Sequence, residues 1–300
     1  MSAIVAAPRV VAARSQRRRW SSTLPHIAPM VVLIVLAAVY LAPFIWMIST
    51  SLKTLTQSIA SPPVWIPDPL IWKAFPDAFT KMNYPLAFRN TLIYAIPAVI
   101  GTVVSCSLVA YGFALVQWRG RNAVFLVVLA TMMLPSQVTL IPLYVIFAKL
   151  GWINTYMPLL VPTFLASAPG TAGGAFFVFL LRQFFLGIPK ELMDAARLDG
   201  ASELRILATI VAPLSAPALI TVGILTFIDK WNDFYGPLIY LQKPESQPLS
   251  LAVQVFSMQH GTDWPLLMAA SILIAAPLVL IYFVAQRRFI EGITLTGLKG

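Results

Sequence analysis

The sequence from residue 91 to residue 116 reads TLIYAIPAVIGTVVSCSLVAYGFALV, a run of 26 residues without Asp, Glu, Lys or Arg. A helix needs about 20 apolar residues to cross a hydrocarbon layer about 30 Å thick. Lipid offers the backbone no hydrogen-bond partners, so a segment that crosses it must be a helix or part of a closed barrel. Barrel strands alternate apolar and polar residues, and this run does not alternate. The stretch therefore predicts a transmembrane helix.

Five further stretches share this absence of charged residues, and each of them is 20 to 25 residues long. They are Ile27–Ile48, Ala123–Phe147, Pro158–Leu181, Thr209–Ile228 and Pro265–Ala285. The sequence therefore predicts an all-α, polytopic membrane protein with six transmembrane helices.

The composition of the whole chain agrees with a membrane protein. Of its 300 residues 59% are hydrophobic and only 11% are charged, whereas a soluble domain carries about 25% charged residues. So few charges cannot cover the surface of a soluble fold of this size, and disordered chains are poor in apolar residues. The single cysteine, Cys106, excludes a disulfide framework and a cysteine-based zinc site.

Lys and Arg are divided unequally between the segments that connect the predicted helices. The N-terminal tail, the link after the second helix, the segment between the fourth and fifth helices and the C-terminus hold 14 of the 21. The other 7 are spread over longer segments on the opposite side. Because positive charge collects on the cytoplasmic side of a membrane, this asymmetry predicts that both termini are cytoplasmic.

The formal net charge of +10 is then mainly a signal of membrane topology. A nucleic-acid interface needs a basic face interleaved with aromatic and polar groups, and the sequence holds no such patch, so no nucleic-acid partner is predicted. The cluster Arg17–Arg19 beside the first helix predicts contact with anionic lipid headgroups, at about 1 kcal/mol per charge.

The predicted organisation has four parts. Residues 1–26 form a basic cytoplasmic tail, and residues 27–88 hold the first helix and an outward loop rich in proline and aromatic residues, where proline forbids a long helix. Residues 89–287 form the core of five transmembrane helices, which includes a cytoplasmic loop at 188–209. Residues 288–300 form a cytoplasmic C-terminal tail.

The cytoplasmic loop is the most informative part of the chain. Residues 188–207 read IPKELMDAARLDGASELRIL. Pro189 suits the first turn of a helix and Gly200 its C-terminal stop, which predicts two short helices joined at a glycine corner. In the first of them, Met193, Ala196 and Leu198 are mixed with charged residues, which predicts an amphipathic helix. Such a projection is typical of an element that docks into a groove of another protein.

One motif in this loop resembles a known family. Asp194-Ala195-Ala196 is followed after three residues by Gly200 and after nine more by Ile210-Val211-Ala212-Pro213. This spacing is that of the EAA loop, E-A-A-x3-G-x9-I-x-L-P, of permease subunits of bacterial ABC importers. Two residues depart from the motif, because Asp194 stands in place of Glu and Ala212 in place of Leu.

Other stretches resemble the carbohydrate-uptake group of these permeases, in particular subunits similar to the smaller maltose permease. The resemblance covers the chain from about residue 30 to its end. The stretches are Asn90-Thr91, Leu134–Val138, Leu180–Phe185, Trp231–Phe234 and Leu298–Gly300.

The resemblance implies the fold of type I ABC importer permeases and a location in the bacterial cell membrane. It implies four kinds of partner: a second homologous permease, a dimer of ATP-binding subunits, an extracytoplasmic solute-binding protein, and a sugar or related polyol, such as an oligosaccharide or glycerol phosphate, as cargo. ATP and Mg would be bound by the partner ATPase, with no cofactor in this chain. A permease for a non-sugar solute and a non-transporting membrane assembly protein are the alternatives.

The resemblance also implies roles for residues at three places. The loop at 188–209 would couple the permease to its ATPase through Glu191, Asp194, Ala195, Ala196, Asp199, Gly200, Ile210 and Pro213. The outward loop would contact the binding protein through Gln259, His260, Gly261 and Thr262. The slim C-terminal tail would contact the ATPase dimer through Thr294, Gly297, Lys299 and Gly300. The alternatives without a contact role are a solvated loop tip for residues 259–262 and a frayed terminus for residues 294–300.

Several polar residues in or beside the predicted helices are candidates for lining a transport pathway. They are Ser105, Tyr111, Gln137, Asn232 and Asp233. Polar side chains in membrane helices often form hydrogen bonds with a neighbouring helix instead. Polar residues at the end of a helix, such as Asp233, can also serve as a structural cap. Both interpretations stay open at this point.

Enzymatic functions are not supported by the residues. The chain has no G-x-x-x-x-G-K-[ST] loop for ATP phosphates, and its two histidines and one cysteine are too widely separated to suggest a metal site or a nucleophile with its base. The predicted spans also hold no acid or histidine, as a proton-coupled carrier would need. The sequence therefore predicts a transport subunit without catalytic or metal-binding residues, driven by energy from a partner.

Overall fold

A computed structural model describes residues 27–167, 173–256 and 262–297, and within these ranges it contains helices and their connections but no strand. The all-α prediction is confirmed. The chain divides into two compact units, Met1–Trp46 and Met47–Gly300.

Helix α1 (Ile27–Ser51) makes up the described part of the first unit and ends in the second. Its segment Pro29–Ser51 has a mean hydropathy of 2.7. Side chains from Met30 to Tyr40 are exposed on all sides of the helix. A helix that is apolar all round needs an apolar environment, so this helix suits lipid contact. Its bounds match the predicted first span to within a few residues.

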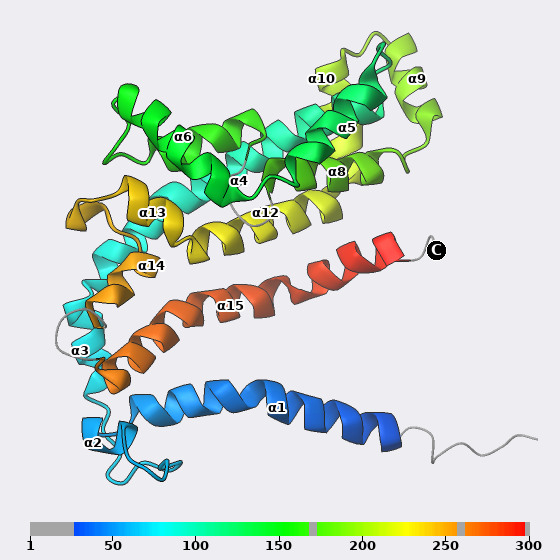
Figure 1. Cartoon of the computed structure of the whole chain (residues 1–300). Helices are drawn as coiled ribbons and strands as arrows, with labels where there is room; N and C mark the ends of the chain where they lie inside the picture. The colour runs from blue at the N-terminus through cyan, green and yellow to red at the C-terminus, as the bar shows by residue number, and fades with distance from the viewer. Residues whose placement is uncertain (1–26, 168–172, 257–261, 298–300) are drawn as a thin grey trace, which may run out of the picture. The chain divides into compact units, whose positions relative to one another are not determined.

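Helix α4 (Tyr84–Ala114) is the central element of the second unit. It begins after Asn83, which has the left-handed φ of 46°, and carries Pro85 in its first turn. Figure 1 shows α8 (Gly173–Phe185) and α12 (Ala216–Asn232) running alongside it. Small residues on the buried face of α4 let these helices approach closely. They include Ala87, Ala95, Ala98, Gly101 and Ala110.

The predicted third span is divided between two helices instead of forming one continuous helix. The structure has α5 (Arg121–Thr131) and α6 (Ser136–Lys149) in its place, with a break before Pro135. Proline cannot donate a backbone hydrogen bond and disfavours helical geometry in the residue before it. Pro135 itself is extended, with ψ of 133°, and directly precedes α6.

The predicted fourth span is also interrupted. It consists of α7 (Met157–Leu160), the 3-10 helix η2 (Val161–Leu165), a left-handed Ala166 and then α8. Ser105 of α4 satisfies part of this break, because its Oγ accepts from the Ala166 N–H (3.1 Å) and donates to the Thr163 carbonyl (2.7 Å). Irregular backbone at membrane depth is tolerated only where protein groups bury and satisfy it.

The predicted fifth span is sharply bent. The helix α10 (Glu203–Ile206), the π-helix η3 (Leu207–Val211) and α11 (Ala212–Leu214) form one arm, which meets α12 at an angle of 85°. The bend lies at Ser215, between Pro213 and Pro217. Each proline lacks the N–H that would continue the ladder of backbone hydrogen bonds, which accounts for the bend.

The remaining elements are mostly short. They are α2 (Leu55–Ser58), α3 (Ala74–Lys81), α13 (Tyr235–Tyr240), η4 (Pro244–Ser246), α14 (Leu249–Ala252), η5 (Val253–Phe256) and the long α15 (Trp264–Gly297). The segment between α1 and α4 holds only the short helices α2 and α3, as its prolines predict. Helix α15 packs against α3 and α12.

Three helices of the described residues are long and apolar enough to cross a membrane, namely α1, α4 and α15. The bent α10–α12 pair raises this number to four, and α5, α6 and α8 are shorter apolar helices. The six predicted spans therefore correspond to three continuous helices, one bent pair and two interrupted stretches.

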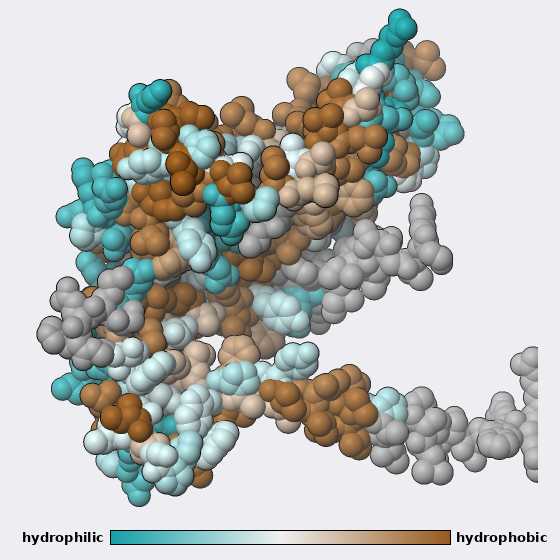
Figure 2. Space-filling view, in the orientation of Figure 1, coloured by the Kyte–Doolittle hydropathy of each residue, from teal (hydrophilic) through white to brown (hydrophobic). Residues whose placement is uncertain are grey.

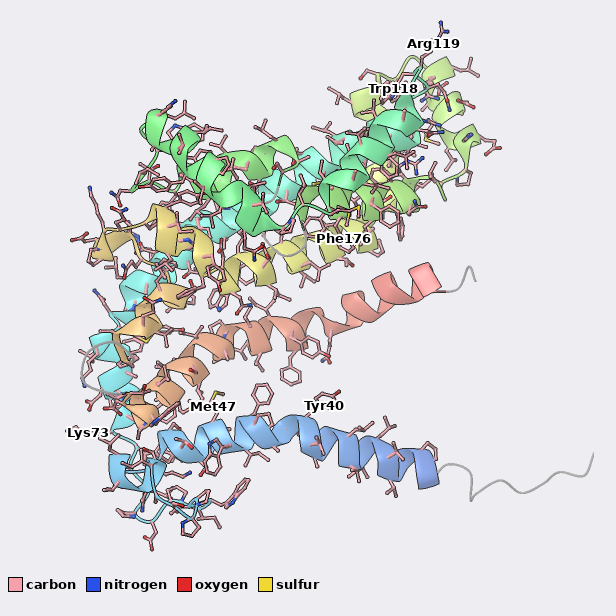
Figure 3. All side chains as sticks on the ribbon, in the orientation of Figure 1. Tyr40, Met47, Lys73, Trp118, Arg119 and Phe176 are labelled. Carbon is pink, nitrogen blue, oxygen red and sulfur yellow. The ribbon has the colours of Figure 1, made fainter. Side chains whose placement is uncertain are left out.

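Polar residues of the second unit gather at its two ends, with a largely hydrophobic surface between them (Figure 2). Figure 3 shows Arg119, in the α4–α5 link, at one end and Lys73, just before α3, at the other. The charge asymmetry in the sequence assigned these two residues to opposite sides of the membrane. Their separation in the structure agrees with that division.

Candidate functional site

Helices α9 (Lys190–Leu198) and α10 form a projection at the end of the second unit that also holds Arg119 (Figures 1 and 3). Gly200 ends α9 with a left-handed φ of 80°. Its N–H donates to the Arg197 carbonyl (3.0 Å), and the Ala201 N–H donates to the Ala196 carbonyl (2.9 Å), which is the Schellman pattern of a helix end. The predicted glycine corner is confirmed.

The apolar residues of α9 do not share one face. Met193 is only 1% exposed and belongs to the same buried cluster as Ile206, whereas Leu198 is 90% exposed. Residues five apart on a helix are rotated by about 140°, so these two side chains must point apart. The predicted amphipathic helix therefore buries Met193 and half-buries Ala196, whereas Leu198 lies outside this apolar face. The leucines that the projection exposes are Leu192, Leu198 and Leu204.

A network of charged groups joins the two helices of the projection. The Arg197 guanidinium donates from Nε to Glu203 Oε1 (2.8 Å), from Nη2 to Glu203 Oε2 (3.2 Å) and from Nη1 to Asp194 Oδ1 (2.9 Å). The Tyr111 hydroxyl of α4 donates to Glu203 Oε2. The hydrogen bonds to Glu203 raise the pKa of Arg197 above its ordinary value, so the guanidinium stays charged.

The structure brings together only part of the predicted coupling set. Asp194 lies in the Arg197 network. Glu191, Ala195 and Asp199 are exposed on the projection, and Ala196 is half-buried. The last two motif residues lie further along the chain, Ile210 half-buried in η3 and Pro213 exposed in α11. The role of these residues in coupling stays a prediction.

Sequence reasoning missed three members of the network: Tyr111, assigned to the pathway candidates, and Arg197 and Glu203. The spacing of Asp194 and Arg197 at i, i+3 on a helix is a signal for an ion pair. Glu203 lies across the corner, and Tyr111 lies 92 positions before it on another helix. No local pattern links residues so far apart.

Gly200→Val tests the corner. A residue with a Cβ at a left-handed φ is strained by about 1–2 kcal/mol, and a factor of 5–30 in an equilibrium corresponds to that energy. We expect the strained corner to displace α9 and to lower transport by a similar factor, while the chain still inserts into the membrane. Transport into vesicles, normalised to the amount of inserted protein, measures the effect.

Gly112→Val is the matched control, because Gly112 lies within α4 and no atom lies within 4 Å of a Cβ added there, just as at Gly200. Of these two glycines, Gly200 has a positive φ and Gly112 does not. Equal transport by the two variants would contradict a special role for the corner.

A second charged cluster lies at the end of α12 opposite to the bend. Lys230 is 1% exposed, and its Nζ is 3.3 Å from Asp229 Oδ2 and 4.0 Å from Asp233 Oδ2. Burial raises the pKa of Asp233, while Lys230 and a hydrogen bond from the Gly236 N–H (3.0 Å) oppose that change. The Tyr94 hydroxyl of α4 donates to the Lys230 carbonyl. The hydrogen bond from Tyr94 ties the end of α12 to the interior of α4.

The five candidates for lining a pathway are placed on different elements. Ser105 and Tyr111 lie on the buried face of α4 and bond other segments, and Gln137 is exposed on α6. Asn232 is exposed and donates to the Ile228 carbonyl (2.8 Å), and Asp233 accepts from Gly236. Ser105 and Tyr111 therefore make the hydrogen bonds between segments that one alternative predicts, and Asp233 makes the local hydrogen bond that a structural cap would make. The pathway role stays a prediction.

The two other predicted contact regions lie largely outside the described residues. This holds for Gln259, His260, Gly261, Lys299 and Gly300. Thr262 is half-buried just before α15. Thr294 and Gly297 belong to the last turns of α15, so helix continues through most of what the sequence suggested to be a slim, flexible tail. The contacts themselves stay predictions.

The described residues thus form apolar helices with a polar projection at one end, and a network of charged side chains joins the two helices of the projection. This arrangement is that of a membrane subunit that can engage a partner at its surface. The sequence model of the family described as "Binding-protein-dependent transport system inner membrane component" matches residues 104–294. The chain belongs to this family of membrane transport components, whose members depend on a solute-binding protein.

Curated relatives agree with this membership. An arabinooligosaccharides transport system permease protein of Halalkalibacterium halodurans is 32% identical over 268 residues, which cover 88% of this chain and 93% of the relative. A trehalose/maltose transport system permease protein of Thermococcus litoralis is 32% identical over 276 residues, which cover 89% of this chain and 94% of the relative. These relatives are permease proteins, and the chain is accordingly a membrane transport component.

A solved structure shares the fold. A bacterial ABC transporter involved in the import of the acidic polysaccharide alginate matches with a TM-score of 0.75 and 23% sequence identity. The match covers 94% of this chain and 100% of that chain. The fold is that of type I ABC importer permeases, as the resemblance in the sequence implies.

Proposed function

We propose that this chain is a permease subunit of an ATP-driven importer that moves a sugar or a related polyol compound into the cell. The observation that carries the proposal is the braced α9–α10 projection, which exposes three leucines beside charged residues and continues through the bent helix into α12. The family membership and the sugar transport named for the two curated relatives support the choice of function and of cargo.

The projection would dock into a groove of a separate ATP-binding subunit. Its exposed residues Leu192, Leu198 and Leu204 suit an apolar groove, as in other helix-in-groove contacts. ATP and Mg would be bound by a dimer of these partner subunits, with no cofactor in this chain. Closure of the dimer would move the projection, and rigid-body movement of this permease against a second, homologous one would give alternating access.

The polar ends of the second unit would then have different tasks. The end with Arg119 and the projection would face the cytoplasm, together with both chain termini, because it carries more of the positive charge. The opposite end would face the extracytoplasmic binding protein, with the predicted contact at residues 259–262. The predicted contact of residues 294–300 with the ATPase dimer would lie on the cytoplasmic side.

The test is reconstitution. The chain is co-expressed with its partner permease and ATP-binding subunit, purified as a complex and placed in lipid vesicles with the binding protein. We expect ATP hydrolysis to rise when the binding protein carries a sugar, with maltose, trehalose and arabino-oligosaccharides as the probes.

The outcomes separate the alternatives. A complex that hydrolyses ATP in response to a binding protein loaded with a non-sugar solute, and to none of the sugars, would replace the cargo but keep the mechanism. Purification without any ATP-binding subunit, from membranes that contain it, would favour a non-transporting assembly protein and would overturn the proposal.

A further inference from the structure

Four side chains from three helices form one continuous set of hydrogen bonds at the base of the projection. Tyr111 on α4 donates to Glu203 at the start of α10, and both oxygens of Glu203 accept from Arg197 on α9. Arg197 also bonds Asp194, which opens the coupling motif. The set connects the central helix of the second unit to the helix that carries that motif.

The inner side of the corner between α9 and α10 is packed, because Met193 and Ile206 belong to one buried cluster. At Gly200 itself no atom lies within 4 Å of the position of a Cβ, so no side chain packs against the turn there. The Arg197–Glu203 pair crosses the corner instead. Two parallel N–H···O bonds between a planar guanidinium and a carboxylate fix direction as well as distance. The pair therefore sets the angle between the two helices, and we call it the brace.

The two ends of this set differ in their surroundings. The side chains of Arg197 and Glu203 are 36% and 47% exposed, and ion pairs in such positions add little to stability. Tyr111 is 5% exposed and belongs to the buried cluster that contains Phe185 and Met193. The brace is thus held to the protein interior by Tyr111. Its effect is to fix the relative position of the helices, and it adds little to the stability of the fold.

We propose that Tyr111 is a positioning residue that anchors the brace to α4, so that a displacement of α9 reaches α4 instead of being absorbed by rotation at Gly200. This inference rests on the proposed function, because it concerns how a partner ATPase drives this permease. It gives Tyr111 a role different from lining the pathway.

The experiment uses the whole transporter complex in vesicles and measures sugar transported per ATP hydrolysed. Tyr111→Phe removes one oxygen and keeps the ring, and Glu203→Gln keeps the shape and removes the charge. A hydrogen bond to a charged group corresponds to roughly a tenfold change in an equilibrium, so we expect each variant to lower the transport-to-hydrolysis ratio by about tenfold. The double variant should fall no further than the lower of the two single variants, because both changes break the same link.

Tyr235→Phe is the matched control, since it removes a hydroxyl from an exposed tyrosine at the start of α13. Its ratio should equal that of the wild type. An unchanged ratio in Tyr111→Phe, or losses that multiply in the double variant, would overturn the inference and leave the proposed function standing. Failure of Tyr111→Phe to co-purify with the ATP-binding subunit would also count against it, because that result assigns Tyr111 to folding. A wild-type complex without sugar-dependent hydrolysis would overturn both proposals.

Discussion

Replacing Lys230 by Met is expected to lower the free energy of unfolding of the protein by about 3–5 kcal/mol, because it removes a buried ammonium group from two half-buried carboxylates. The side chains of Asp229 and Asp233 are only 14% and 18% exposed, and the Lys230 Nζ lies between them. Methionine fills a similar volume, so the loss would come from charge and not from a cavity. Denaturant unfolding in detergent micelles measures it.

Two further variants make this test specific. Lys243→Met changes an exposed lysine and should have an effect near zero. Adding Asp233→Asn to Lys230→Met removes one of the two negative charges that Lys230 faces and should restore part of the stability. If Lys230→Met unfolds at the same denaturant concentration as the wild type, the cluster does not stabilise the fold.

Gly174→Ala is expected to destabilise the protein by about 3 kcal/mol or more, at the upper end of the range for overpacked cores. An added Cβ would lie 1.8 Å from the carbonyl oxygen of Ala166 and 2.5 Å from its carbonyl carbon. These are backbone atoms, which cannot move aside as a flexible side chain can. The first turn of α8 would have to separate from the interrupted stretch that precedes it.

The matched control for Gly174→Ala is Gly112→Ala. Both glycines lie in helices, but no atom lies within 4 Å of a Cβ at Gly112. Alanine is a better helix former by about 1 kcal/mol, so Gly112→Ala should be neutral or stabilising. Thermal melting of the two purified variants in detergent separates them. A melting temperature of Gly174→Ala equal to that of the wild type would refute the close approach of α8 to Ala166.

The sequence predicted where apolar helices lie but not where they are interrupted. The absence of charged residues indicates that a segment can enter lipid. It does not indicate whether the segment forms one continuous helix. Pro135 and Pro213 are visible in the sequence at the break and at the bend, yet proline is also tolerated within membrane helices, so its presence alone does not predict an interruption. The structure shows that Ser105 satisfies the backbone freed at the interruption after η2.

The projection was predictable in outline for a local reason. A glycine stop after an amphipathic stretch is encoded within a dozen residues, and Gly200 adopts the left-handed backbone that this pattern requires. The brace was not predictable, since its parts come from different helices. The exposure of Leu198 was not predictable either, because this residue is the last of the nine in α9 and lies outside the face that buries Met193.

The right-angled bend at Ser215 has a mechanical consequence. With α12 along the membrane normal, the 12 residues from Glu203 to Leu214 run parallel to the membrane surface as an arm about 18 Å long. A force that acts in the membrane plane, across the outer end of such an arm, exerts a torque about the axis of α12. A displacement of about 5 Å at that end would turn the arm by about 15° for this length. The bend therefore makes the arm a lever on α12. A small movement of the arm at the membrane surface would tilt or rotate α12 within the membrane.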